Sequence, residues 1–554
     1  MLIKNTDYSK KKPSFKSASA LTTQVLRCLN TNPSLGATSI DILSMSAPRT
    51  IIDGVDRGFD AGTETGIREG SGTANHALIG AYGIGASALL SKGINSAFDV
   101  KANKVYANFE GIDTIGSIWH DLTKANEKAS PIQLRKMLFE RVLTQVRGNA
   151  HAADGRLHKV AIDKNSLKSF MEELSDYMDK NPKAYKIPQK LYDRLKSILT
   201  YSTSAETDYI LKNGKYATRS DLDTLLKSTY SLGKLFSEPK ALNTFKNSTE
   251  FNLNNFVKVL KNTKLKSSIL GVAIAMGIGA SVQPINVWLT KKRTGKEGFV
   301  GVEGEKPDTS LKFKVKKSAA ALGFLAFAYA TIVDNVFKTP FKKQMGQLIN
   351  RLQFNGLIPS IPQFKAVYGF TIASRLFSAR GDNELRESST KDFLGFVNWL
   401  ILGDFVQKSV ASMSKNNLTN YDPKIHGKGI LNRIFNPRVK VKSHDEILFE
   451  ELRKQNMPRN MLSSVDGRQL NAKELIKKFY DKLPNLKTRI RGKNIAQLSG
   501  YLYSALVLGI FIPKLNIAIT NHFQEKKKKQ QEENNKFVNS IGNENFKIFY
   551  NDAA

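Results

Sequence analysis

The stretch SSILGVAIAMGIGASVQPINVWLT, residues 267–290, contains no charged side chain and is enclosed by basic residues at positions 264, 266 and 291–293. As an α-helix with a rise of about 1.5 Å per residue, it is long enough to cross a hydrocarbon core about 30 Å thick. A soluble core does not require so long an apolar helix with lysines at both ends. The stretch therefore predicts an all-α, multi-pass membrane protein.

Two further stretches support this prediction. Residues 318–337 (SAAALGFLAFAYATIVDNVF) and 494–513 (NIAQLSGYLYSALVLGIFIP) can each span when their ends reach the headgroups. In lipid, small residues four apart let helix backbones approach closely. We therefore expect residues 264–337 to form a transmembrane hairpin packed through small residues, namely Gly271, Ala275, Gly279, Ala319 and Gly323.

A weaker candidate span is residues 71–91 (SGTANHALIGAYGIGASALLS), which is uncharged but contains Asn75, His76 and several glycines. This composition fits a marginal membrane helix, a buried core helix or a re-entrant segment. A Gly-rich, charged segment precedes it. We expect residues 48–98 to form a charged loop followed by this helix.

The composition limits how much of the protein lies in the membrane. The 554 residues include 84 Lys and Arg against 49 Asp and Glu, a formal net charge of +35. The mean hydropathy of −0.32 is too polar for a protein that is nearly all membrane. The positive charge favours anionic lipid or nucleic acid as a partner, unless it is only a general lysine bias. Most aromatic residues are Phe in apolar surroundings, so we expect anionic lipid, leave protein partners open and do not expect nucleic acid.

Cysteine and histidine usage gives no sign of a cofactor. A single cysteine, Cys28, excludes an internal disulfide framework and a CxxC metal site. The histidines form no ligand-like pair. We therefore expect no cofactor and no bound metal.

The rest of the chain divides by composition. We expect a basic, disordered leader (1–47), a soluble helical region (99–263), amphipathic or interfacial helices (338–413), a basic polar region (414–493), a transmembrane helix (494–520) and a disordered tail (521–554). Lysines flank both ends of the apolar stretches, so the positive-inside rule does not orient the protein. The number of spans lies between two and five, and the membrane that holds them is not defined.

Charged residues of both signs gather with glycines between residues 49 and 72. The candidate ion- or phosphate-binding residues of this loop are Arg49, Asp53, Asp56, Arg57, Asp60, Glu64, Arg68 and Glu69. Close carboxylates can hold a divalent cation, and Gly-rich backbone can present N–H groups to phosphate. The order of residues matches neither an EF-hand loop nor a P-loop. The alternative, which we favour, is a solvated linker whose acids pair with its own arginines.

A second charged patch lies at residues 374–392. Its candidate residues are Arg375, Arg380, Asp382, Arg386 and Glu387. Both patches contain an Arg-Gly step and an Arg-Glu pair, at residues 68–69 and 386–387, which suggests two related units meeting as in inverted-repeat transporters. The intervals between these matched residues differ, so the sequence favours coincidence.

The sequence contains no coherent catalytic motif and leans against an enzyme. Gly83 to Ala88 fits a loose dinucleotide pattern but lies outside any βαβ unit. We expect an integral membrane protein with a structural or interaction role, docking basic regions on anionic lipid. The alternative is a membrane enzyme or transporter for a phosphate-bearing or ionic substrate, using the two charged patches with Asp334 and Asp404. If the two patches meet in one cavity, the alternative is favoured.

Overall fold

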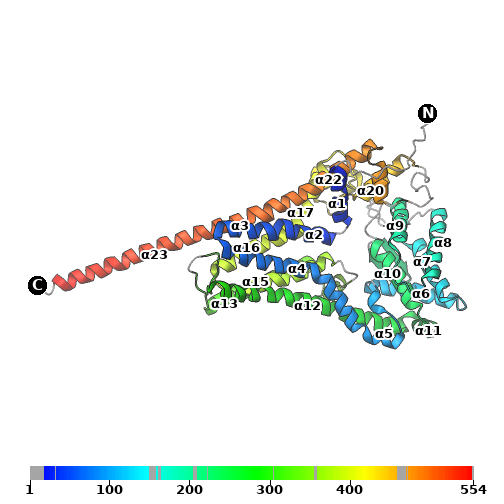
Figure 1. Cartoon of the computed structure of the whole chain (residues 1–554), viewed down its shortest axis with the longest axis horizontal. Coiled ribbons are helices and arrows are strands. Elements are labelled where there is room, and N and C mark those ends of the chain that lie inside the picture. Colours follow the sequence, from blue (N-terminus) through cyan, green and yellow to red (C-terminus); the bar gives the residue numbers. More distant parts are fainter. Residues whose placement is uncertain are drawn as a thin grey trace.

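The computed structural model describes residues 18–551 except 32, 106, 149–157, 160–163, 204–208, 221, 303–304, 355–358, 458–469 and 471. Within this part the chain is almost entirely helical, which confirms the all-α prediction. A long bundle of helices forms the body, with a globular region at one end and a protruding C-terminal helix at the other (Figure 1).

The bundle begins with helices where we predicted a disordered leader and a loop. After α1 (Ala18–Thr31), α2 (Pro33–Ile40), the π-helical segment η1 (Asp41–Ser46) and α3 (Ala47–Arg57) follow one another. Gly58, with φ of 92°, then turns the chain into α4 (Phe59–Leu90), which packs back along α3. Both predictions are wrong for the described residues, and positions 1–17 of the leader lie outside them.

Glycines explain why the predicted loop is a helical hairpin. Gly58 forms the turn, and Gly54 of α3 and Gly62 of α4 face each other across it. A Cβ atom on Gly62 would lie 2.6 Å from the Cα of Gly54, so only glycine permits this approach of α4 to α3. These glycines therefore belong to a turn and a helix contact rather than to a loop.

The predicted transmembrane hairpin has the right helices but the wrong partners. The helix α12 (Asn255–Thr294) packs along α4 and α15 (Ile361–Phe377), and α13 (Leu311–Ile332) packs on α15. A Cβ on Gly271 would meet Gly83 of α4 at 2.8 Å, and one on Gly279 would meet Thr371 of α15 at 2.5 Å. Gly323 faces open space within the described residues. The small residues of α12 thus pack against α4 and α15.

Residues 338–413, predicted to be interfacial, contain the central helix of the bundle. After α14 (Phe341–Arg351), α15 is buried along most of its length, with Phe364, Val367 and Thr371 fully enclosed. The chain continues through α16 (Asp382–Val397), the π-helical segment η4 (Asn398–Leu402) and α17 (Gly403–Met413). Packing of α15 against α4, α12, α13 and α16 accounts for its burial.

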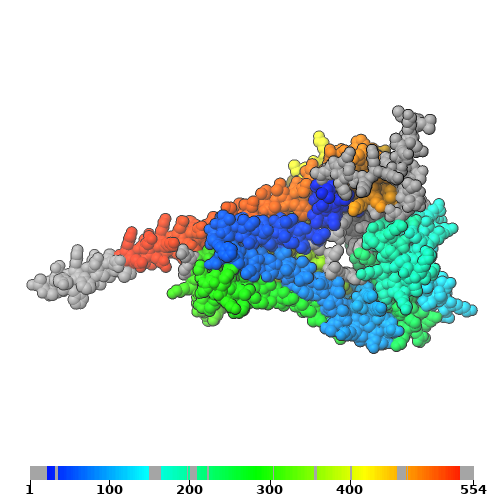
Figure 2. Space-filling model, in the orientation of Figure 1, coloured from blue at the N-terminus to red at the C-terminus, as the bar shows by residue number. Residues whose placement is uncertain are grey.

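The last apolar helix continues far beyond the bundle. It comprises α22 (Pro484–Leu506), the π-helical segment η6 (Val507–Phe511) and α23 (Ile512–Asn551), which leaves the body as a single rod (Figures 1 and 2). The structure places a helix where we predicted a disordered tail. Lys, Gln and Glu, which dominate residues 524–533, are strong helix formers, and no Pro interrupts the helix after Pro513.

A globular region joins α4 to α12 and has its own core around Trp119, Phe236 and Phe245. Its helices are α5 (Lys92–Phe98), η2 (Ala102–Lys104), α6 (Phe109–Ala125), α7 (Pro131–Gln145), α8 (Lys164–Lys180), α9 (Gln189–Thr203), α10 (Leu222–Phe236), α11 (Pro239–Asn247) and η3 (Phe251–Leu253). A small sheet, in the order β2-β1-β3-β4, is formed by β1 (Arg147–Gly148), β2 (His158–Lys159), β3 (Tyr209–Asn213) and β4 (Tyr216–Ser220).

A smaller helical region joins α17 to α22. It contains α18 (Pro423–His426), α19 (Ile430–Phe435), α20 (His444–Lys454) and α21 (Ala472–Phe479). Leu448, Leu475 and Ile490 belong to its core, so the residues predicted as a basic polar region form a packed unit. The salt-bridged pair Arg27 and Asp445, at 2.5 Å, ties α1 to this unit.

Within the described ranges, three helices are long and apolar enough to cross a membrane: α12, α13 and the helix from Pro484 to Lys536. The bent pair of α4 and α5 passes the same test when taken together. Near the C-terminal end of α12, Ile285 and Trp288 are 51% and 58% exposed, whereas Gln283 and Asn286 are buried. In this part of the helix the distribution is the reverse of that in a helix packed on a water-soluble core.

Candidate functional site

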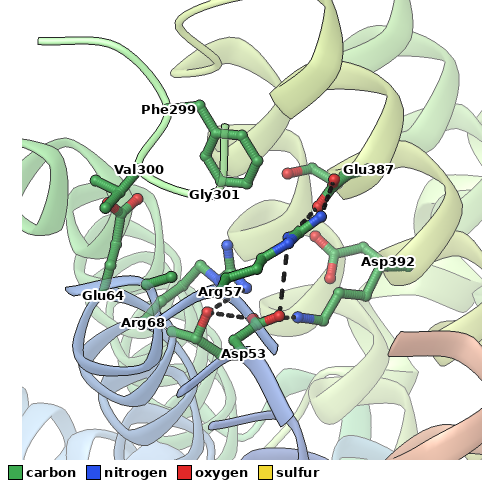
Figure 3. Close-up of a pocket in the computed structure, with 13 residues that line it drawn as sticks. Asp53, Arg57, Glu64, Arg68, Phe299, Val300, Gly301, Glu387 and Asp392 are labelled. Carbon is green, nitrogen blue, oxygen red and sulfur yellow. Dashed lines mark hydrogen bonds and ion pairs between the residues drawn. The ribbon is translucent and has the colours of Figure 1, made fainter. Parts of the chain in front are cut away.

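Two helical hairpins meet at the same end of the bundle. The first hairpin is α3–α4 and turns at Gly58, and the second hairpin is α15–α16 and turns before Gly381. Arg57 of the first donates to both carboxylate oxygens of Glu387 on α16, at 2.5 and 2.9 Å. Arg380 of the second donates to Glu64 on α4 at 2.5 Å. The two hairpins therefore hold each other through a crossed pair of salt bridges, one of which Figure 3 shows.

Deeper in the bundle, a second layer of charge joins the same helices. Arg375 of α15 lies 3.0 Å from Asp392 of α16 and 3.4 Å from Glu69 of α4. Arg49 of α3 lies 3.6 Å from Glu69. These four side chains are each at most 3% exposed, so their charges are removed from water and must be balanced by each other.

Between these layers lies a buried lysine–aspartate pair. Lys391 of α16 is 3.5 Å from Asp53 of α3, and Thr65 donates to Asp53 at 2.6 Å. Lys391 and Asp53 thus balance each other's charge away from water.

The segment after α12 covers the network from the end of the bundle. Phe299, Val300 and Gly301 line a cavity of about 20 Å³ together with Arg57 and Glu387 (Figure 3). A cavity of this size holds one water molecule. The Phe299 ring centroid lies 5.8 Å from the guanidinium carbon of Arg57 and also from that of Arg380, so one aromatic ring covers both crossed arginines. In this state the site is closed.

The buried charges are balanced in number. We name this set the ionic network: its basic members are Arg49, Arg57, Arg68, Arg375, Arg380 and Lys391, and its acidic members are Asp53, Glu64, Glu69, Glu384, Glu387 and Asp392. Because no charge is left over, the closed site needs no counterion. Among the residues that the structure describes, no group of three or more His, Cys, Asp or Glu is placed to hold a metal ion.

Most predicted site residues fall in the ionic network, and the rest lie at its rim. Asp56 pairs with Lys514 at 3.6 Å, and Asp60 with Lys296 at 3.8 Å. Asp382 pairs with Lys316, and Arg386 lies over the Phe523 ring and donates to Thr520. The linker alternative for residues 49–69 does not describe this arrangement, since their partners come largely from the second hairpin. Of the two further acids considered, Asp334 pairs with Arg351 at the surface, and Asp404 lines a separate cavity.

The network members that sequence reasoning missed are Glu384, Lys391 and Asp392. The sequence contains a signal for Lys391 and Asp392. The two hairpins match residue by residue when Arg57 is aligned with Arg380. Identical pairs at this offset are Arg57/Arg380, Gly58/Gly381, Glu64/Glu387, Gly72/Gly395 and Asn75/Asn398, and similar pairs are Thr65/Ser388, Arg68/Lys391 and Glu69/Asp392. The alignment of Arg68-Glu69 with Arg386-Glu387 that the sequence suggested is therefore out of register, because Arg68 and Glu69 align with Lys391 and Asp392.

The match extends to a third helix in each half. Along α12 and α22–α23 the paired residues are Lys264/Lys493, Gly271/Gly500, Gly279/Gly509, Asn286/Asn516 and Thr290/Thr520. The intervals agree except for one extra residue between Gly500 and Gly509, where the π-helical segment η6 accommodates it. Asn286 donates to the backbone carbonyl of Glu64 at 3.0 Å, and Asn516 donates to that of Glu387 at 2.9 Å.

The chain thus contains two three-helix repeats. Each repeat has a hairpin, then a globular insertion, then a third helix bonded to the network glutamate of its own hairpin. Both hairpins turn at the same end of the bundle (Figure 1), so the repeats are parallel rather than inverted as we had considered. No family model, curated protein or solved structure matches the chain.

Proposed function

We propose that this chain is a multi-pass integral membrane protein of the transporter type, and that the ionic network binds an anionic substrate, phosphate-bearing compounds included. The observation that carries the proposal is the crossed pair of salt bridges at the interface between two repeats. Transporters built from internal repeats bind their substrates at such interfaces. Intramembrane charges, where they occur, commonly mark substrate or ion pathways.

The distribution of side chains supports a membrane location. In α22 and η6, Leu502 and Phe511 are each 61% exposed, whereas Gln497 and Ser504 are buried. In α3, Ile51 and Val55 face outward and Asp53 faces inward. A bundle with apolar side chains outside and ion pairs inside suits hydrocarbon, because lipid solvates the outer surface and the buried charges pair with one another.

The chemistry of the network favours an anion. Arg57 presents a bidentate fork to Glu387, and Arg380 binds Glu64 and Glu384. Arginine forks bind phosphate and carboxylate ligands in the same geometry. An anionic substrate can therefore take the place of a glutamate, and displacement of Phe299 would give it access from the end of the bundle.

Transport is tested with purified protein in proteoliposomes. Currents or uptake are recorded after jumps of inorganic phosphate, succinate and chloride, with empty vesicles as background. We expect a saturable signal for at least one of these anions that Arg57→Gln reduces tenfold or more. The control variant is Arg386→Gln, which changes an arginine of α16 that lies outside the ionic network. A parent protein with no signal for any of the three anions would overturn the transport proposal.

Membrane insertion is tested separately and does not depend on the substrate. If the apolar outer surface of α12, α13 and α22 lies in lipid, the protein should stay in the pellet when membranes are extracted with alkaline carbonate. A peripheral protein held by its lysines is released by this treatment. Recovery in the supernatant would show that the helices form a soluble core instead.

A structural role at an anionic membrane surface is the second candidate, and a specific feature favours it. The protruding helix α23 carries exposed lysines at positions 526–529. Each lysine near an anionic leaflet contributes about 1 kcal/mol of attraction. Proteoliposomes of phosphatidylcholine should therefore bind phosphatidylglycerol vesicles, and replacement of these four lysines by serine should abolish binding. Binding that is unchanged by the replacement would contradict this role.

A further inference from the structure

A second cavity lies away from the ionic network, between α1–α2, η4–α17 and α22. Its volume is about 250 Å³, which is room for several water molecules. Its polar lining residues are Asn30, Trp399, Asp404, Gln407, Gln497, Tyr501 and Ser504. Leu29, Ile40 and Ile361 add an apolar wall. This combination of an apolar wall with a few polar groups is typical of small-molecule sites.

Three π-helical segments adjoin this cavity. Trp399 belongs to η4, Ile40 directly precedes η1, and Ser504 lies just before η6. Both η1 and η4 contact η6. A π-helical turn inserts an extra residue at a cost in regular hydrogen bonding and occurs frequently at functional sites. Three of them around one cavity indicate that the opening is built into the fold.

The first repeat has fewer polar groups in the matching region. The counterparts of Gln497, Tyr501 and Ser504 on α12 are Ser268, Val272 and Ala275. The corresponding part of α4, residues 80–84 (GAYGI), contains neither a carboxylate nor a carboxamide. The polar lining therefore belongs to the second repeat.

Three polar groups of the cavity have acceptor atoms that no described donor occupies. Asp404 makes no hydrogen bond or ion pair with the residues that the structure describes, although the charge of Lys493 acts on it. Gln497 is 3% exposed and donates its amide to the backbone carbonyl of Leu26, and its Oε1 atom is a buried acceptor without a described partner. Ser504 donates to the Gly500 carbonyl, which leaves only its lone pairs.

We propose that this cavity binds a small primary amine, with its ammonium group on Asp404 and Gln497 and its apolar part against Trp399 and Ile361. An ammonium group supplies several N–H donors and a positive charge, which is the complement of one carboxylate and two neutral acceptors. The apolar wall takes the carbon skeleton of the ligand. The site is independent of the proposed anion transport, since no network residue lines it.

Binding is tested on the full-length, detergent-solubilised protein by equilibrium dialysis with radiolabelled 2-phenylethylamine. 2-Phenylethanol, which has nearly the same shape without the charge, is the comparison ligand. We expect saturable binding of the amine that is at least tenfold tighter than binding of the alcohol. Asp404→Asn should remove this preference by weakening the amine at least tenfold while changing the alcohol less than threefold.

Gln497→Leu provides a second variant and should also weaken the amine, by threefold or more. Asp481→Asn, which changes an exposed acid outside the cavity, is the control and should bind like the parent. Unfolding temperatures establish that each variant is folded. If Asp404→Asn does not fold, the binding of the amine to Gln497→Leu tests the proposal. No saturable binding of the amine, equal binding of amine and alcohol, or unchanged binding in the folded cavity variants would each overturn the proposal.

Discussion

Replacing Arg375 by leucine should lower the free energy of unfolding by about 3–5 kcal/mol, the cost of leaving a buried charge without its partner. Arg375 is the guanidinium that Glu69 and Asp392 share, and all three side chains are enclosed. Without it the two carboxylates face each other in a site that excludes water. Unfolding of the parent and variant in detergent, followed by circular dichroism or by denaturant titration, measures the loss.

The control for Arg375→Leu is Arg386→Leu, which should cost less than about 1 kcal/mol because Arg386 lies at the rim of the network. Converting Glu69 and Asp392 to Gln and Asn in the Arg375→Leu background should recover part of the stability, since the unpaired charges are then gone. A loss below about 1 kcal/mol for Arg375→Leu would show that water or a counterion reaches this layer and that the network is not closed.

Replacing Gly62 by leucine should destabilise the protein by about 3 kcal/mol and separate the first hairpin. A Cβ atom at this position would lie 2.6 Å from the Cα and 3.0 Å from the backbone N of Gly54, and backbone atoms cannot rotate away. The change also displaces Asp53 and Arg57 of α3 relative to α4, which should weaken the crossed salt bridges. Unfolding temperature measures the first effect, and crosslinking of cysteines placed at 57 and 387 measures the second.

Gly70→Leu is the matched control, because Gly70 lies on the same helix and nothing among the described residues comes within 4 Å of its added Cβ. It should be neutral or slightly stabilising, since a glycine in a helix interior costs about 0.5–1 kcal/mol relative to alanine. If the two variants had equal stabilities, the close approach of α3 and α4 would not be what the glycines provide.

The sequence predicted the helical class and the membrane-length helices, because both follow from local composition. An uncharged stretch such as residues 267–290 has few alternatives to a long helix. The same local reasoning misjudged residues 48–72, where glycines and charges are typical of loops. Their period of four residues, which indicates a helix surface, became meaningful only once α3 was seen to pack on α4 through Gly54 and Gly62.

Helix partners were the part that the sequence did not provide. Small residues on α12 indicate close packing but do not say against what, and α15 rather than α13 turned out to face Gly279. Most candidate residues lie in the ionic network, because charges of both signs in an apolar region are conspicuous in the sequence. The pairing of these charged residues was not predictable from local sequence, since Arg57 and Glu387 are distant along the chain. An alignment of Arg57 with Arg380 would have revealed the repeat and would have suggested this pairing.

The crossed salt bridges have a mechanical consequence. Arg57 belongs to the first hairpin and is held by the second, and Arg380 belongs to the second and is held by the first. A displacement of either hairpin relative to the other therefore strains both salt bridges together. Separation of the hairpins requires both salt bridges to break in the same movement. The anionic ligand proposed above, by replacing one glutamate, would then lower the barrier to separation for both repeats.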